Sequence, residues 1–198
     1  MSPWELTLAL LLGVGLSAST GLNTFLPLLL LSAAAKFHVA GITLNGSFGW
    51  LASDTAIIIL IVACILEIIA DKVPAVDHFL DAVGTFGRPI AGGLAMASVL
   101  DGADPVVAAV VGLIVGSPIS LGFHTLKAGT RVASSAVTFG CANPVISIVE
   151  DIISLGLSVL AIFVPFLVPV AVLLLVWLLW KVGHRLAAAP AQPPQAMG

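Results

Sequence analysis

The chain has very few charged residues. Asp, Glu, Lys and Arg make up 9% of its 198 residues, hydrophobic residues make up 60%, and the mean hydropathy is +1.19. A typical soluble domain has about 25% charged residues, so this composition excludes an ordinary soluble domain. The seven Lys and Arg residues form no basic run, and we therefore exclude nucleic acid as a partner.

Cysteine is also scarce, and common catalytic motifs are absent. Cys64 and Cys141 both lie in apolar sequence, which favours two small buried hydrophobic residues over a disulfide or a metal pair. There is no GxSxG, HExxH, GxGD, P-loop or CxxC motif. We therefore expect no enzyme activity and no cofactor, and only a bound cation is left open. Residues 1–5 lack the basic segment of a secretory signal, so we expect the first helix to be retained.

The chain does contain long apolar runs. A membrane span needs about 20 mostly apolar residues; residues 51–69 and 105–121 approach this length, and residues 145–182 are long enough for two spans. We predict an all-α fold, a polytopic transmembrane helical bundle formed by residues 1–186 as one domain. The Ala/Pro-rich residues 187–198 are predicted to form a flexible tail.

The ends of the apolar runs indicate an orientation. Basic residues follow the last run, and the positive-inside bias therefore places the C-terminus in the cytoplasm. Tryptophans lie near the ends of apolar segments, where their rings favour the headgroup level. The basic residues are Lys181, His184 and Arg185, and the tryptophans are Trp4, Trp50, Trp177 and Trp180.

Several apolar runs are interrupted. As one helix, residues 6–35 would be about 45 Å long, which exceeds a hydrocarbon core of about 30 Å. Polar residues 17–23 interrupt this run, so we predict two half-helices that meet at a polar break. Such backbone is tolerated at membrane depth only where protein or a cavity surrounds it. We predict further breaks at residues 116–118, 128–131 and 141–144. The predicted bundle therefore contains broken or re-entrant helices.

The middle of the chain predicts two short helices and a turn. Residues 75–87 follow amphipathic helical spacing, and residues 90–100 are rich in Gly and Ala. Asp104 and Pro105 mark an N-cap and the first position of the next helix. Small residues at helical spacing allow helices of two copies to pack closely, so a homodimer is among the predictions. These residues are Gly92, Gly93 and Ala97.

The two halves of the chain are weakly alike. Residues 4–100 and 104–186 each contain a Gly-containing polar break, at 21–23 and at 129–131, followed by a helix with two acids. Interrupted apolar segments at matching places indicate an inverted-repeat transporter with a binding site near the bilayer midplane. We therefore include two inverted repeats in the predicted fold.

The acidic residues inside the apolar runs are the strongest functional signal. A charge at membrane depth costs roughly 3 kcal/mol or more, so it faces a partner, a cavity or a substrate path. One hypothesis is a four-acid cluster that binds a proton, a monovalent cation or a hard metal ion, to which two asparagines at breaks add oxygen atoms. The alternative is that these acids neutralise basic residues in buried ion pairs. The acids are Glu67, Asp71, Glu150 and Asp151, and the asparagines are Asn23 and Asn143.

The basic residues admit two interpretations. Lys127 and Arg131 flank the predicted break at 128–131, so they either balance the acids or bind an anionic group at a helix N-terminus. Arg88 and His124 are assigned to the same anion-binding or charge-balancing role. Snorkelling to the interface is the alternative for the long side chains. For the group Asp77, His78 and Asp81, a solvated helix face is favoured over a metal site.

Five short motifs together resemble an uncharacterised bacterial integral-membrane family, the domain-of-unknown-function family 4126, over about residues 10–165. The resemblance implies a small multi-pass protein of the bacterial inner membrane and brings no established substrate. The motifs are Gly21-Leu22-Asn23 with Pro27; Glu67-x-x-x-Asp71-Lys72-x-Pro74-x-x-Asp77; Arg88-Pro89-x-x-Gly92; Lys127-x-x-x-Arg131; and Asn143-Pro144 with Glu150-Asp151.

Three functions follow from these observations. The first is a small inner-membrane transporter or channel for an ion or small solute, with a cation favoured. The second is a translocator or binder of an anionic, phosphorylated lipid, based on the basic residues near helix breaks. The third is a membrane scaffold without transport, whose polar residues only pair helices. Expected partners are the lipid bilayer and the ion or solute.

Overall fold

A computed structural model describes residues 2–72, 74–138 and 141–187, without the side chains of residues 74–81, 137, 183, 186 and 187. These residues are almost entirely helical and contain no strand, which confirms the all-α prediction. Most of the tail predicted at 187–198 lies outside the described residues. The helices are α1 (Pro3–Leu22), α2 (Leu26–Lys36), α3 (Asp54–Ala70), α4 (Pro74–Ser98), α5 (Pro105–Val111), α6 (Ser117–Thr138), α7 (Asn143–Phe163) and α8 (Val168–Ala187).

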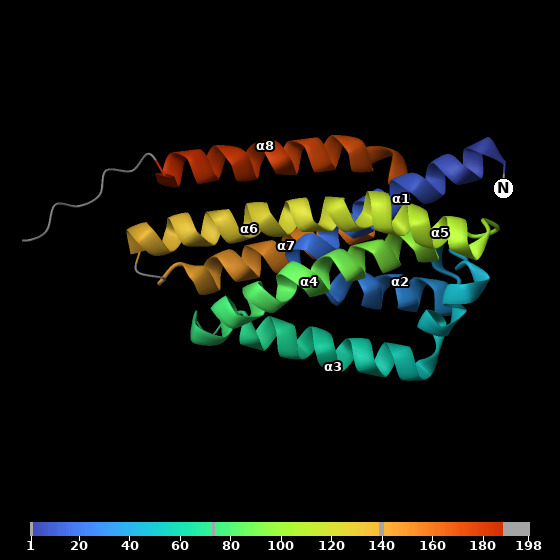
Figure 1. The fold of residues 1–198 in the computed structure, drawn as a ribbon, viewed down its shortest axis with the longest axis horizontal. Coiled ribbons are helices and arrows are strands. Elements are labelled where there is room, and N and C mark those ends of the chain that lie inside the picture. The colour runs from blue at the N-terminus through green and yellow to red at the C-terminus, as the bar shows by residue number, and fades with distance from the viewer. Residues whose placement is uncertain (1, 73, 139–140, 188–198) are drawn as a thin grey trace, which may run out of the picture.

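The helices lie lengthwise between two ends of the bundle (Figure 1). At one end, called here the N-terminal end, lie the start of α1, the loop after α2 and the start of α5. At the other, the C-terminal end, lie the ends of α6 and α8 and the start of α7. Helix α1 stops inside the bundle, where Leu22 and Asn23 are fully buried, and α2 returns toward the N-terminal end.

Apolar side chains cover the outside of this bundle. Among the described residues, four helices are long and apolar enough to cross a membrane, and a fifth span results if Gly46–Ala52 and Asp54–Ala70, bent by 63°, count as one. Water around so large an apolar surface would be unfavourable, whereas lipid is its natural solvent. The chain is therefore organised as a multi-pass membrane protein. The face of α3 alone exposes Ile58, Ile59, Val62, Ile65, Leu66 and Ile69.

Glycines let α4 cross α5 and α6 at backbone contact. A Cβ atom on Gly112 would lie 2.3 Å from the Gly93 carbonyl oxygen, and one on Gly116 would lie 2.5 Å from the Gly92 oxygen. Larger residues would push the helices apart. The small residues of α4 are thus used within the chain, so a homodimer stays a prediction that has lost this support.

The break predicted at 116–118 is wrong. Residues Gly112–Gly116 form a π-helical turn that joins α5 to α6 without interruption. Pro118 follows this turn directly, and because proline has no N–H to donate, the wider turn accommodates the missing hydrogen bond.

The break predicted at 128–131 is also wrong, because α6 continues through Gly129 to Thr138. A glycine in a helix interior costs only about 1 kcal/mol, and the packing of α6 on α1 and α4 exceeds this cost. Because the break at 128–131 is absent, the second half of the chain lacks the matching break on which the two-repeat prediction was based. The repeat itself stays a prediction. The two short helices predicted at 75–87 and 90–100 are likewise one helix, α4, which passes through Pro89.

Other local predictions are confirmed. Asp104 Oδ1 accepts hydrogen bonds from Val106 N and Val107 N, so it caps α5, and Pro105 is the first helical residue. The break at 141–144 is present, with α7 beginning at Asn143. Cys141 is exposed, not buried, whereas Cys64 is buried as expected.

Candidate functional site

The site is built around the break between α1 and α2. The break predicted at 17–23 lies at the end of that segment, at Asn23–Phe25, and the hydroxyl groups before it bond back to the helix. Ser19 Oγ donates to the Gly15 oxygen and Thr20 Oγ1 to the Ser17 oxygen. These bonds give the buried hydroxyl groups partners within α1, and the polar segment is helical up to Leu22.

Basic side chains satisfy the end of α1. Lys127 Nζ donates to the Leu22 oxygen at 2.8 Å, and Arg88 Nη1 donates to the Gly21 oxygen at 3.3 Å. The last carbonyl groups of a helix have no partner within it and carry partial negative charge. A cation is therefore the favoured partner here, where neither lipid nor water reaches the backbone.

An acidic side chain satisfies the start of α2. Glu67 accepts from the backbone N–H groups of Thr24, at 2.9 Å to each carboxylate oxygen, and of Phe25, at 3.2 Å. The Thr24 hydroxyl also donates to it at 2.7 Å. Asn23 Oδ1 accepts from Leu26 N. Glu67 thus acts as a cap supplied by another helix, in line with the positive end of the α2 dipole.

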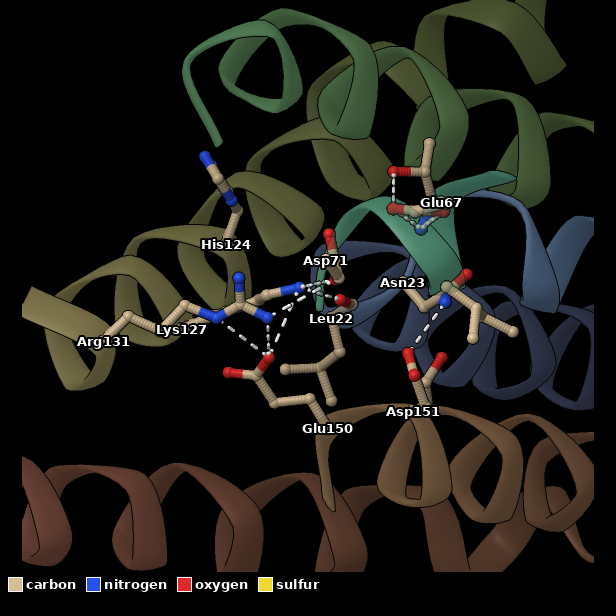
Figure 2. Close-up of polar contacts among 12 residues, drawn as sticks. Leu22, Asn23, Glu67, Asp71, His124, Lys127, Arg131, Glu150 and Asp151 are labelled. Atoms are coloured by element: carbon tan, nitrogen blue, oxygen red, sulfur yellow. Dashed lines mark hydrogen bonds and ion pairs between the residues drawn. The ribbon is translucent and has the colours of Figure 1, made fainter. Parts of the chain in front are cut away.

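Four charged side chains meet next to this break and are called here the ion quartet: Asp71, Lys127, Arg131 and Glu150 (Figure 2). Lys127 Nζ lies 3.1 Å from Asp71 Oδ2 and 3.4 Å from Glu150 Oε2. Arg131 Nη2 lies 3.4 Å and 2.6 Å from the same two oxygen atoms. The four side chains are at most 5% exposed, so two acids and two bases neutralise each other inside the bundle.

Asp151 and Asn23 extend the network through α7 and the α1–α2 break. Asp151 Oδ1 accepts from Asn23 Nδ2 at 2.9 Å, and its other oxygen lies 3.3 Å from Lys72 Nζ. Lys72 Nζ also donates to the Ile68 oxygen. This pair is less buried than the quartet, since the Lys72 side chain is 32% exposed. It links α7 to the break and to the end of α3.

Arg88 and His124 extend the network through α4 and α6. Arg88 lies 3.7 Å from Glu67 Oε1 and contacts His124 Nδ1 at 2.6 Å. Because a guanidinium only donates, Nδ1 must accept, and the ring proton is on Nε2. That proton faces Thr85 Oγ1 at 3.2 Å. His124 thus links α6 to Arg88 and Thr85 of α4.

Several buried oxygen atoms in this region have no partner. Asp71 and Glu150 each use one carboxylate oxygen in the quartet, and their second oxygen atoms have no hydrogen bond. Asn143 Oδ1 and Ser147 Oγ, on the buried face of α7 that carries Glu150, are also unpaired. An unsatisfied buried group costs about 1–3 kcal/mol. The surplus consists of acceptor oxygen atoms, which a proton, a cation or a water molecule would satisfy.

The structure thus supports the alternative of buried ion pairs and corrects the four-acid cluster. Asp71 and Glu150 share partners, whereas Glu67 caps α2 and Asp151 pairs with Lys72. Within the described part of the chain, no three His, Cys, Asp or Glu side chains lie close enough to hold a metal ion, so the four-acid metal site is wrong. The reason is that Glu67 faces a helix end and Asp151 faces Lys72, so only Asp71 and Glu150 meet at the same bases.

The basic residues also need correction. Lys127 and Arg131 lie in the middle of the continuous helix α6, not beside a helix N-terminus, and their partners are carboxylates. Asn143 contacts Ser135 and no residue of the quartet. The side chains of Asp77, His78 and Asp81 lie outside the described residues. Sequence reasoning missed Thr24 as a partner of Glu67, since nothing in its type or spacing marks it.

Comparison with known proteins identifies the family and no more. The chain matches the family described as Domain of unknown function (DUF4126) over residues 10–185, and it belongs to that family. No curated protein matches the chain, and no solved structure does.

Proposed function

We propose that this protein is a multi-pass carrier of protons or small monovalent cations in the bacterial inner membrane, with Asp71 and Glu150 as its binding groups. The observation that supports this proposal is the pair of unpaired carboxylate oxygen atoms, Asp71 Oδ1 and Glu150 Oε1, inside an otherwise paired network. These oxygen atoms, one on each acid of the quartet, are acceptors that a proton or a cation can use without breaking an existing ion pair.

Charge balance favours a single positive charge as the ligand. The quartet is neutral, so one additional proton or monovalent ion leaves it with a single positive charge, whereas a divalent ion would leave two. Protonation of Asp71 or Glu150 weakens the attraction of that acid for Lys127, which also holds the Leu22 oxygen at the tip of α1. Cation binding is thereby coupled to the position of the α1–α2 break.

The break is the mobile element in this proposal. In a membrane, α1 and α2 act as a re-entrant hairpin whose tip carries the substrate site, as in transporters built from broken helices and inverted repeats. The proposed orientation is based on the basic residues: Lys181 and Arg185 lie toward the end of α8, and Lys36 lies in the last turn of α2, which ends at the other end of the bundle. The positive-inside bias then places the C-terminus in the cytoplasm.

The two other functions have weaker support. A phosphorylated lipid needs free cations, but the side chains of Lys127 and Arg131 are at most 2% exposed and already contact carboxylates. A scaffold without transport accounts for the ion pairs but makes no use of the unpaired oxygen atoms of Asp71 and Glu150. The absence of enzyme activity stays an expectation.

The test is cation flux into proteoliposomes, followed with reporters for protons, sodium and potassium. We expect flux in the wild type, loss of flux in Glu150→Gln, and unchanged flux in Asp54→Asn, whose carboxylate is exposed. Because Glu150→Gln disturbs ion pairs, Ser147→Ala is tested as well. Ser147→Ala removes an unpaired hydroxyl group. If the protein is a scaffold, this variant has unchanged or higher stability and shows no other change. If the protein is a carrier, the variant transports the cation more slowly than the wild type.

Two results would overturn the proposal. The first is wild-type protein that transports none of the three ions. The second is undiminished flux in folded Glu150→Gln. Anionic lipid that copurifies with the wild type and is lost in Arg131→Ala would shift the assignment to lipid handling.

A further inference from the structure

A cavity of about 740 Å³ opens at the N-terminal end of the bundle. It lies between α1, the loop after α2, the turn before α5 and the end of α7. Leu12 of α1 and Ala161 of α7 form part of its wall. The ion quartet lies farther along the bundle, since Glu150 precedes Ala161 by about three turns of α7.

The charges around this cavity are acidic. Glu5 and Asp101 are the charged residues among the described residues that line it, and no basic side chain of these residues lines it. The Glu5 carboxylate accepts from Ser2 N in the cap of α1 and keeps its negative charge. Low-dielectric walls focus such a field and raise the local concentration of cations.

A polar row on α7 leads from this cavity toward the quartet. The buried face of α7 contains Ser158, Ser154 and Glu150 on successive turns below Ala161. Ser158 Oγ is fully buried and unpaired, one turn from the cavity wall. Ser154 Oγ donates to the Ser19 oxygen on α1. At 1.5 Å per residue, Ala161 and Glu150 are about 16 Å apart along the helix.

We propose that this cavity is the outer vestibule of the cation path, that it takes small hydrated monovalent cations, and that Ser158 is the first group below it. This inference rests on the proposed function of Asp71 and Glu150 and adds the route and the side of access. The acids gather the cation, and the serine hydroxyl groups replace its hydration between the vestibule and the quartet.

The vestibule is tested first without transport. Leu12→Cys is introduced with Cys141→Ser, which removes the exposed thiol, and the protein in nanodiscs reacts with a cationic or an anionic methanethiosulfonate reagent. Relative to a free thiol, we expect the cationic reagent to be favoured about tenfold, the low end of electrostatic focusing. Glu5→Gln with Asp101→Asn abolishes this preference. The control Leu11→Cys lies next to Leu12 and outside the cavity lining, and shows none.

Transport then tests the connection to the quartet. We expect modification of Leu12→Cys by the cationic reagent, and separately Ser158→Val, to slow flux severalfold while the protein stays folded. Equal reaction with both reagents at Leu12→Cys, or flux that is unchanged after modification, overturns the vestibule even if the carrier is real. Absence of wild-type flux overturns the carrier, and the charge preference of the labelling still decides whether the cavity gathers cations.

Discussion

The replacement Lys127→Met measures how much the buried network contributes to stability. Lys127 is fully buried, and its Nζ loses contacts with Asp71, Glu150 and the Leu22 oxygen. Removing one partner of a buried ion pair costs about 3–5 kcal/mol, because the remaining charge is left uncompensated. The unfolding equilibrium should therefore shift by at least about a hundredfold.

The control is Lys36→Met. Lys36 also pairs with one aspartate, Asp54, but that carboxylate is 85% exposed. Exposed pairs contribute about 0–1 kcal/mol, so this variant should be close to wild type. Both substitutions remove one lysine charge and retain a long apolar side chain, and they differ mainly in burial.

The assay is titration with sodium dodecyl sulfate in mixed micelles, followed with a fluorogenic maleimide. In a Cys141→Ser background the remaining thiol, Cys64, is buried and reacts when the bundle unfolds. The double variant Lys127→Met with Asp71→Asn restores neutrality, and we expect it to recover about 1–3 kcal/mol relative to the sum of the single effects. The reasoning would be refuted if Lys127→Met and Lys36→Met lowered the free energy of unfolding equally. It would also be refuted if the effects of Lys127→Met and Asp71→Asn were additive in the double variant.

Two further predictions use the same assay. Glu67→Gln should destabilise the bundle by about 1–3 kcal/mol, because an amide cannot accept at both positions where the N–H groups of the α2 start now bond; a change below a few tenths of a kcal/mol would contradict its role as a cap. Gly116→Ala should destabilise the bundle, since the new Cβ would lie 2.5 Å from the Gly92 oxygen. Gly129→Ala should stabilise the bundle by up to about 1 kcal/mol, because its Cβ meets nothing within 4 Å and α6 is continuous there. Stabilisation by Gly116→Ala, or destabilisation by Gly129→Ala, would disprove the packing described here.

Composition and periodicity were enough to predict the helical fold and its apolar spans. The prolines and acids at helix starts also placed the start of α5 and the break before α7, because Asp104 and Pro144 act within one turn of backbone. Local sequence was misleading at Gly129. There the helix is maintained by packing against α1 and α4, which no local pattern reports.

The site was predicted by residue type and not by arrangement. The cost of a buried charge singled out Glu67, Asp71, Glu150 and Asp151, and all four do lie inside the protein. Which base each acid faces depends on how α3, α6 and α7 are packed against the tip of α1. Glu67 illustrates the difficulty: it lies four residues from Asp71 on the same helix face, yet it serves a helix end 42 residues earlier in the chain.

The dependence of the α1–α2 break on later residues constrains how the protein is assembled. Its carbonyl and N–H groups have no partner within a helix and are satisfied by Glu67, Arg88 and Lys127, all of which are synthesised after it. The hairpin that leaves the ribosome first therefore has no stable place in lipid until α3, α4 and α6 have been inserted. We expect the α1–α2 hairpin to reach its final position only after these later helices. Truncation of the chain before α6 should therefore leave the hairpin open to proteolysis.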